Sequence, residues 1–514
     1  MGMKVECAKP EFKTVDLFAG PGGLAEGFSA FRRANGKKIF DIALSVEKEP
    51  SAFATLRLRS FFRQFAKAPE AYYDYIAGRI SKEDLVSAYP EEWQSAELET
   101  AMLELGTDEA REEIDERLED IITQAGTNTV VIGGPPCQAY SLVGRARNQG
   151  IKGYVASEDH RHFLYREYIR ILERLRPAAF VMENVKGILS SKIGGEHIID
   201  QVLADLRAAG GIENSYLLVP IVDDDRGRLP GHMIRSENFG IPQCRHRVIL
   251  AGLRRDIAET WERSGKPLPR LAPAVRQAKV EHVLAGMPAL RSGLSKAEDS
   301  SSNWRVAAVK AFQIAAGACR RDGNWLNDVT ARLLDYAKIL DTDGDIPPRS
   351  STRTAPIEDN QLGAWIGDDR LTELPNHASR GHMESDLSRY AFAAAFAEIF
   401  GHSPKADEFP ADLAPNHKNW DSGKFSDRFR VQSWGSPSTT VTSHISKDGH
   451  YFIHPDPRQC RSLTVREAAR LQTFPDNYFF EGNRTQQYVQ VGNAVPPLLA
   501  NQIAEVIADM LGAI

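Results

Sequence analysis

The sequence has few cysteines, no long apolar run and no overall excess of basic charge. Its five cysteines are scattered over 514 residues without a C-x-x-C pair, which argues against structural zinc and a disulfide framework and fits a reducing cytoplasm. No apolar stretch is long enough to cross a bilayer, and residues 1–5 lack the apolar core of a signal peptide. We therefore expect a cytoplasmic chain with no bound metal and no membrane contact.

The charge is distributed unevenly along the chain. The formal net charge is -6, which by itself does not indicate a nucleic-acid-binding protein. Residues 91–120 contain 13 acidic and 2 basic side chains, whereas residues 243–279 contain 9 basic and 3 acidic ones. A basic face can therefore exist on an acidic protein. For the acidic run, a solvated helix face is the favoured interpretation.

Strand-like and helical segments alternate in the first half of the chain. The predicted strands cover 12–18, 40–46, 129–134, 178–182 and 247–252. This alternation predicts an α/β fold with a doubly wound, mostly parallel sheet in a domain over 11–255. The chain from 51 to about 123 looks helical throughout, and we interpret about 59–123 as an insertion.

The second half has a different texture. Prolines and weak periodicity over 256–459 predict a second, smaller and irregular domain. The pattern returns in a segment over 460–514. There Thr464 and Glu467 have the spacing of a capping box, and a last helix is predicted from about Pro497 to Leu511.

The most informative motif is Pro135-Pro136-Cys137-Gln138, which follows the β-branched run 129–134. A cysteine just past a buried parallel strand lies at the carboxyl edge of the sheet, where ligands bind. The two prolines stiffen the loop and so fix where the sulfur points. Taken alone, Cys137 fits a nucleophile and a buried inert thiol equally well.

Other polar motifs end or precede predicted strands. The turn Ala19-Gly20-Pro21-Gly22-Gly23 lets the backbone approach a ligand, although it also fits a tight turn or a dinucleotide site. Glu47 is placed to hold ribose hydroxyls, or is an ordinary strand-end acid. Glu183-Asn184 ends one strand, and Gln243-Cys244-Arg245-His246-Arg247 precedes another. An arginine fork there fits a carboxylate, a base oxygen or a phosphate, or forms a weak surface ion pair.

Together and in this order, these segments resemble DNA (cytosine-5) methyltransferases. The matching stretches are 16–28, 46–47, 133–141, 159–161, 176–189, 238–252, 461–476 and 490–499. The resemblance implies a Rossmann-like catalytic domain that uses S-adenosylmethionine over 11–255. It also implies a target-recognition domain over 256–459 and a return segment, 460–514, that completes both.

The resemblance assigns roles to particular residues. Cys137 would add to carbon 6 of cytosine, Glu183 would protonate ring nitrogen 3, and Arg247 would hold the base oxygen and orient Glu183. Arg245 is expected on a phosphate. Contacts with S-adenosylmethionine are expected from Phe18, Gly20, Gly22, Gly23, Glu47 and Asn493, and the candidate pair flanking the adenine is Asp120-Ile121.

The implied substrate is double-stranded DNA with the target cytosine flipped out of the stack. Contacts with DNA are expected from Gln138, Ser141, Thr440 and Val441, although the segment that holds the last two fits an ordinary strand equally well. The resemblance implies a prokaryotic, cytoplasmic and nucleoid-associated monomer. A restriction endonuclease that acts on the same site can accompany such an enzyme.

Three other interpretations deserve comparison. A non-catalytic DNA reader with the same fold is disfavoured by the intact set Cys137, Glu183 and Arg247. An NAD-dependent oxidoreductase, suggested by the glycine turn, leaves 461–497 unexplained. An RNA cytosine methyltransferase on the same scaffold is disfavoured by the long region 255–460, because reading several base edges of a duplex needs an extra domain.

Overall fold

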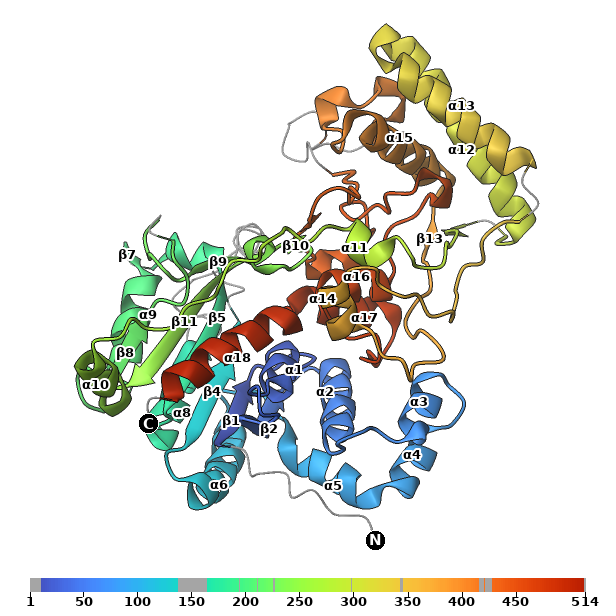
Figure 1. Ribbon diagram of the computed structural model, residues 1–514. Helices are drawn as coiled ribbons and strands as arrows, with labels where there is room; N and C mark the ends of the chain where they lie inside the picture. The colour runs from blue at the N-terminus through green and yellow to red at the C-terminus, as the bar shows by residue number, and fades with distance from the viewer. Residues whose placement is uncertain are drawn as a thin grey trace.

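The computed structural model describes residues 11–136, 164–193, 195–209, 211–224, 227–296, 298–342, 345–415, 420 and 428–512. Cys137, Gln138 and Ser141 lie outside these ranges. An α/β body forms the lower part of the view in Figure 1, and a group of helices projects from it at the upper right. None of the helices in the described ranges is both long and apolar enough to cross a membrane.

The α/β body is organised around a mixed eight-stranded sheet. Its strands are β1 Phe12–Leu17, β2 Phe40–Glu47, β3 Thr100–Met102, β4 Thr129–Gly133, β5 Ala179–Val185, β8 Tyr216–Val219, β9 Met233–Arg235 and β11 His246–Arg254. They run in the order β3-β2-β1-β4-β5-β11-β8, with β9 also paired to β11. The first five are mutually parallel, which confirms the predicted α/β class. β11 is antiparallel to β5, β8 and β9.

Helices cover both faces of the sheet. The covering helices are α1 Gly23–Ala30, α2 Pro50–Arg63, α6 Asp108–Ala125, α8 Leu164–Leu175, α9 Ile198–Arg207 and α18 Pro497–Leu511, with α10 Arg255–Ser264 at the β8 end. Along β4, Val130 and Ile132 face the core that contains α1 and α18, whereas Val131 faces the core that contains α6, α8 and α9. Burial on both faces explains why this strand is continuously apolar. Short hairpin strands β6 Lys192–Ile193 and β7 Glu196–His197 precede α9.

The segment 59–123 differs from the expected helical insertion. β3 interrupts it and extends the sheet beside β2, and α6 leads from β3 into β4, so both belong to the α/β pattern. The additional helices are α3 Glu70–Ile76, α4 Lys82–Ala88 and α5 Pro90–Glu99. The three-residue β3 escaped prediction because it is short and lies between helices, where a period of two cannot be recognised.

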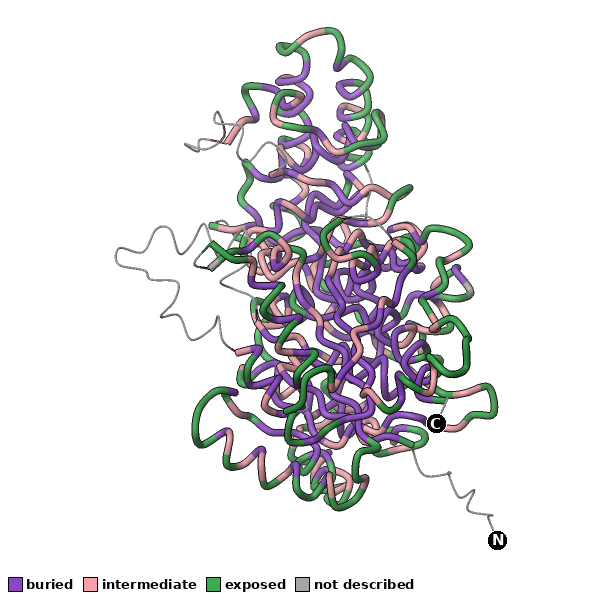
Figure 2. Tube along the Cα trace, turned by 90° about the vertical axis from the view of Figure 1, so that its left-hand side faces the viewer, coloured by how far each residue is buried: buried purple, intermediate pink, exposed green. Residues whose placement is uncertain are grey.

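The region 256–459 contains long helices in addition to irregular chain. Its helices are α11 Glu281–Leu284, α12 Ser301–Asp322, α13 Asn327–Thr342, α14 Asn360–Ile366 and α15 Glu384–Phe400, and its short strands are β12 Gly293–Leu294, β13 Gly381–His382 and β14 Ser438–Thr439. β14 pairs with β10 Gln243–Cys244. α15 packs against α12 and α13 and buries residues all around its axis, so it has no polar face and gave weak helical periodicity. Figure 2 shows buried residues continuing from the sheet into this group.

The return segment carries α16 Val465–Leu471, α17 Arg484–Asn493 and α18. The capping box predicted at α16 is present, with Thr464 and Glu467 exchanging hydrogen bonds. α18 has the predicted bounds and folds back onto α1, beside which it lies in Figure 1. A Cβ on Gly27 of α1 would come within 2.5 Å of Pro497 O, so the two helices require a glycine at their contact.

Candidate active site at the carboxyl edge of the sheet

An acid near the end of β5 and an arginine near the start of β11 lie side by side at the carboxyl edge of the sheet. Antiparallel pairing sets Glu183 opposite Ile249 and Val185 opposite Arg247. The Glu183 Oε1 and Arg247 Nε atoms are 2.7 Å apart, and both side chains are mostly buried. The contact is an ion pair without hydrogen-bond geometry at Nε, and its short distance between mostly buried charges restricts the direction of the carboxyl group.

The Glu183 carboxyl group faces the loop that leads toward Cys137. A Cβ on Gly134 would lie 3.0 Å from Glu183 Oε2, so the chain passes directly beside the acid. The Gly134 amide donates to Leu17 O at 3.3 Å, which ties the end of β4 to the end of β1. The described chain stops at Pro136, one residue before the predicted nucleophile. The predicted roles of Cys137, Gln138 and Ser141 therefore stay predictions.

The glycine turn after β1 has the conformation expected of a ligand cradle. Phe18, Gly20 and Gly22 have φ angles of 56°, 58° and 95°, all in the left-handed region. The two glycines enter this region without strain. A Cβ on Gly23 would come within 2.3 Å of Val495 O, whereas the space beside Gly20 is open to at least 4 Å. The turn is therefore packed at Gly23 and open beside Gly20, where a small ligand has room to approach the backbone.

Glu47 organises the same edge from the end of β2. Its Oε2 accepts from the Gly20 amide at 2.8 Å, and its Oε1 accepts from the amides of Lys48 and Glu49 at 2.9 and 2.8 Å. These bonds hold the carboxylate beside the glycine turn, as expected for a group that binds ribose hydroxyls. Asn493 is exposed at the end of α17.

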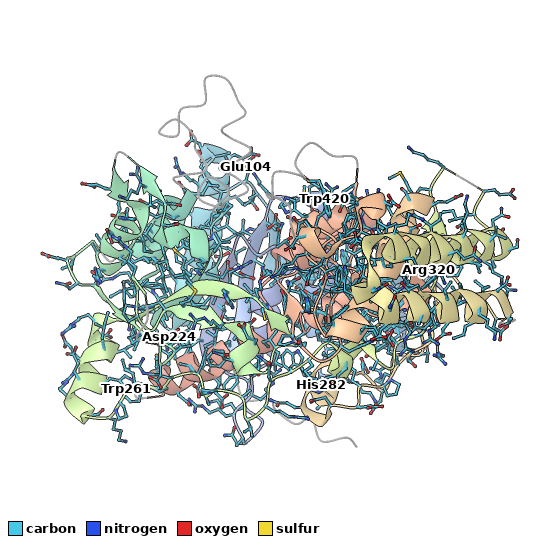
Figure 3. The ribbon with its side chains drawn as sticks, turned by 90° about the horizontal axis from the view of Figure 1, so that it is seen from above. Glu104, Asp224, Trp261, His282, Arg320 and Trp420 are labelled. Atoms are coloured by element: carbon cyan, nitrogen blue, oxygen red, sulfur yellow. The ribbon has the colours of Figure 1, made fainter. Side chains whose placement is uncertain are left out.

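Asp120-Ile121, the candidate adenine-flanking pair, does not lie at the carboxyl edge of the sheet. Asp120 and Ile121 lie within α6, and Ile121 packs into the core under the sheet, so this candidate is replaced. The end of β3 brings Leu103 and Glu104 to the edge instead, because the Leu103 amide donates to Glu47 O at 3.2 Å. Glu104, labelled in Figure 3, pairs with Lys48 at 2.8 Å. An apolar residue followed by an acid was a usable signal, but β3 itself had not been recognised.

Arg245 is held differently from the phosphate contact expected of it. Its side chain is buried, and Nη1 donates to Val441 O at 2.9 Å and Gly492 O at 3.2 Å. Burial, together with the nearby charge of Arg247, lowers the pKa of the Arg245 guanidinium. A guanidinium enclosed by backbone carbonyls has no free face for a phosphate.

The Thr440-Val441 pair forms part of the same enclosure. Val441 is fully buried and its amide donates to Gln243 Oε1 at 2.8 Å, so its side chain does not face DNA. Thr440 Oγ1 donates to Cys244 O at 2.5 Å, next to the β14–β10 pairing. Of the two predicted DNA contacts, only Thr440 remains partly exposed.

One ionisable group at this edge had not been predicted. Asp16, two residues before Phe18, is completely buried, and neither carboxyl oxygen has a hydrogen-bond partner. Burial raises its pKa to about 8 although Arg63 opposes the shift, and the negative charge of Glu47 adds to it. Its position at the end of an apolar strand gave no indication of which way the side chain turns.

A separate pocket of about 280 Å³ lies between β9 and residues 271–277. Its walls include charged side chains that are paired with one another, such as Arg235 Nη1 with Asp224 Oδ2 at 3.0 Å. The residues at the carboxyl edge described above do not line it. It therefore does not enlarge the candidate active site.

Comparisons with known proteins identify the family of this chain. The family model for C-5 cytosine-specific DNA methylases matches residues 104–330 and 344–509. The type II methyltransferase M.Bpa9945I of Bacillus paralicheniformis is 34% identical over 97% of this chain and 98% of its own length. The DNA (cytosine-5-)-methyltransferase M.ApeKI of Aeropyrum pernix is 26% identical over 75% of this chain and 82% of its own.

A solved structure supports the fold. An E. coli prophage protein assigned as a DNA modification methyltransferase superposes with a TM-score of 0.52, covering 98% of this chain and 99% of its own, at 19% identity. The family model covers most of this chain, and the similarity to M.Bpa9945I extends over nearly its full length. This chain belongs to the C-5 cytosine-specific DNA methylase family and is a DNA (cytosine-5-)-methyltransferase.

Proposed function

We propose that this enzyme transfers a methyl group from S-adenosylmethionine to carbon 5 of a cytosine flipped out of a specific sequence in double-stranded DNA. The observation that carries the proposal is the Glu183–Arg247 pair, 2.7 Å apart, beside the loop that leads into Cys137. An acid whose direction is fixed by an arginine can hold one edge of a planar base while a nucleophile adds to the ring.

The proposed chemistry begins with activation of the ring, because cytosine carbon 5 is a poor nucleophile. The thiolate of Cys137 adds to carbon 6, and Glu183 donates a proton to ring nitrogen 3 as negative charge develops there. Arg247 orients Glu183 and hydrogen-bonds the base oxygen. Bound S-adenosylmethionine supplies the activated methyl group. Carbon 5 would take the methyl group, with S-adenosylhomocysteine as the leaving group. Carbon 5 would then lose its proton to water, nitrogen 3 would return its proton to Glu183, and the bond to Cys137 would break to regenerate the thiolate.

The residues proposed to hold the methyl donor surround the glycine turn. Glu47 would accept hydrogen bonds from the ribose hydroxyls, and Leu103-Glu104 would flank the adenine. The remaining contacts are assigned to Phe18, Gly20, Gly22, Gly23 and Asn493. The open space beside Gly20 and the orientation of the Glu47 carboxylate support this assignment.

We assign target recognition to the region 256–459. This region follows the catalytic domain 11–255 and precedes the return segment 460–514. Gln138, Ser141 and Thr440 are the proposed DNA contacts, whereas Val441 is withdrawn because it is buried. Extruding a cytosine costs a few kcal/mol, which contacts from this region would offset. Relatives named type II methyltransferases support a role beside a restriction endonuclease of the same specificity. We further propose that the enzyme acts as a monomer.

The nucleophile is tested with Cys137→Ala. We expect the variant to lose tritium transfer from labelled S-adenosylmethionine to DNA while it still binds DNA, because only bond formation at carbon 6 is removed. Wild-type protein should also form a covalent adduct with DNA that contains 5-fluorocytosine, since fluorine at carbon 5 blocks the release step. Retained turnover by the variant would refute the assignment of Cys137.

The alternative of a DNA reader without catalysis makes the opposite prediction. It requires DNA binding by the wild type without tritium transfer or adduct formation under turnover conditions. Bisulfite sequencing of DNA from cells that express the chain would report both activity and sequence context. Unmethylated DNA in that experiment would favour the reader.

A further inference from the structure

The C-terminal end of α17 is held by side chains from two other parts of the chain. A helix leaves its last carbonyl groups without partners inside the helix. Here Gln472 Nε2 donates to Val491 O at 2.7 Å, and Arg245 donates to Gly492 O at 3.2 Å and to Asn493 O at 3.4 Å. The end of α17 is therefore fixed by α16 and by the start of β11 rather than by a local cap.

These side chains form a connected buried network. Gln243 Nε2 donates to Gln472 Oε1 at 3.1 Å, while Gln243 Oε1 accepts from the Val441 amide at 2.8 Å and Arg245 donates to Val441 O at 2.9 Å. Gln243, Arg245 and Gln472, here named the polar lock, are 0%, 1% and 0% exposed. Buried polar networks whose members bond one another have a single preferred arrangement.

The polar lock connects the two halves of the active site. On one side, Arg245 precedes Arg247 by two residues, and Arg247 contacts Glu183. On the other side, the chain leaves α17 and passes over the glycine turn, where Val495 O would lie 2.3 Å from a Cβ on Gly23. The position of the α17 end therefore sets how the backbone of 493–497 lies on the proposed donor site.

We infer that Arg245, together with Gln243 and Gln472, positions residues 493–497 over the methyl donor relative to the Glu183–Arg247 pair, and that Arg245 does not contact a DNA phosphate. The inference rests on the proposed function. Group transfer depends on the alignment of donor and acceptor, and a misplacement of about 1 Å can cost about 10²-fold in rate. A fully buried connection between the two subsites supplies that alignment. Arg245 is thus a positioning residue.

The test is Arg245→Lys, which retains the charge but loses the planar fork that reaches several carbonyls at once. We expect calorimetric binding of S-adenosylhomocysteine to weaken by about tenfold, equivalent to about 1.4 kcal/mol. Amide exchange in 491–499 should accelerate, because the end of α17 is released. The slope of DNA affinity against salt should stay as in the wild type, because no phosphate contact is removed.

A matched control is Arg470→Lys. Arg470 is also fully buried; it donates to the backbone carbonyls of Val283 and Ala355 and pairs with Asp476, and it contacts no residue of the polar lock through these bonds. We expect this variant to lose stability without a change in S-adenosylhomocysteine affinity, measured at a temperature where both variants are folded. Equal donor affinity in the two variants would reduce Arg245 to a structural residue and overturn the inference.

Other outcomes distinguish the remaining explanations. A salt slope reduced by about one with unchanged donor binding would identify Arg245 as a phosphate contact and overturn the inference. If Arg245→Lys does not fold, Gln472→Met carries the same test, because it removes the bonds to Val491 O and Ala494 O.

Wild-type protein without donor binding or methyl transfer would instead refute the proposed function. An active wild type with unaltered donor affinity in the variants would refute only the positioning role.

Discussion

At the scale of single residues, burial decides what each polar group near the glycine turn can do. Glu47 is partly exposed and accepts hydrogen bonds from three backbone amides, which hold its carboxyl group beside the glycine turn. Asp16, one strand away, is completely buried and without a hydrogen-bond partner. A carboxyl group in such surroundings holds its proton, because ionisation would place in the interior a charge that Arg63 offsets only in part.

Asp16 should make stability depend on pH. Its pKa is raised to about 8 in the folded chain, whereas the unfolded chain releases this proton near pH 4. Between these values the folded state binds more protons, so the free energy of unfolding falls as pH rises, by at most about 1.4 kcal/mol per pH unit. Urea unfolding from pH 5 to 8 should show this slope in the wild type and a smaller one in Asp16→Asn.

Asp41 provides a control of opposite sign. Burial raises its pKa, but Lys38 and Lys13 outweigh that effect and hold the pKa below its usual value. Its contribution to stability is present above about pH 4 and is lost as pH falls through the folded pKa. Asp41→Asn should leave the slope between pH 5 and 8 as it is in the wild type. Equal slopes in the wild type and Asp16→Asn would contradict the prediction for Asp16.

At the scale of elements, the additional helices α3 and α4 connect parts of the chain that are far apart in sequence. From α4, Lys82 Nζ lies 3.5 Å from Glu481 Oε1. Tyr73 Oη donates to Asp368 Oδ2 at 2.7 Å, and Tyr75 Oη donates to Glu481 Oε1 at 2.6 Å. The Arg370 guanidinium lies 4.6 Å from the centre of the Tyr73 ring. The helices therefore join the region after α14 and the chain before α17 to the catalytic body, to the right of α2 in Figure 1.

Asp368 is the centre of this connection. It accepts from Tyr73 Oη, from Asn477 Nδ2 at 2.6 Å and from the Arg370 amide at 2.9 Å. Burial raises its pKa, but the bonds from Asn477 and Tyr73 outweigh that and hold the pKa low. Asp368→Ala leaves these donors without their acceptor, so we expect a loss of about 2 kcal/mol in the free energy of unfolding by urea.

The control is Glu373→Ala, which removes only the more exposed ion pair with Arg79 at 2.6 Å. Exposed pairs contribute little to stability, so this variant should unfold like the wild type. If Asp368→Ala is as stable as Glu373→Ala, the connection made by α3 and α4 does not hold these segments in place.

At the scale of the whole molecule, charge distribution matters more than total charge. The chain is acidic overall, with a net charge of -6, yet 243–279 is basic. DNA that docks on such a protein must meet local positive charge, and each phosphate contact releases counterions. The strength of binding should therefore depend on ionic strength even though the protein as a whole repels DNA.

The corresponding measurement is DNA affinity against salt concentration. We expect the logarithm of the association constant to fall linearly with the logarithm of salt, with a slope of about -0.9 for every phosphate contact. Binding of S-adenosylhomocysteine to the same protein serves as a comparison, since it involves no DNA phosphate. Between about 50 and about 200 mM salt, several phosphate contacts would weaken DNA binding by about 10³-fold or more. A DNA affinity that does not change over this range would argue against a duplex substrate.

Local sequence alone predicted much of this protein, because several features depend on neighbouring residues. The capping box at Thr464, the bounds of α18, and β1, β2, β4 and β5 follow from side-chain spacing and buried β-branched runs. The approach of Glu183 to the loop before Cys137 followed from parallel strands that end at one edge.

Only the tertiary structure decided the remaining features. β3 is three residues long and exists because β2 pairs with it, and α15 is buried on all sides, which hides its period. Arg245 and Arg247 are two residues apart with similar local sequence, yet one meets Glu183 and the other the carbonyls that end α17. Arg245 reaches a carbonyl 247 residues away in sequence, and Glu183 is also distant in sequence from Arg247, so no local propensity contains the choice of partner.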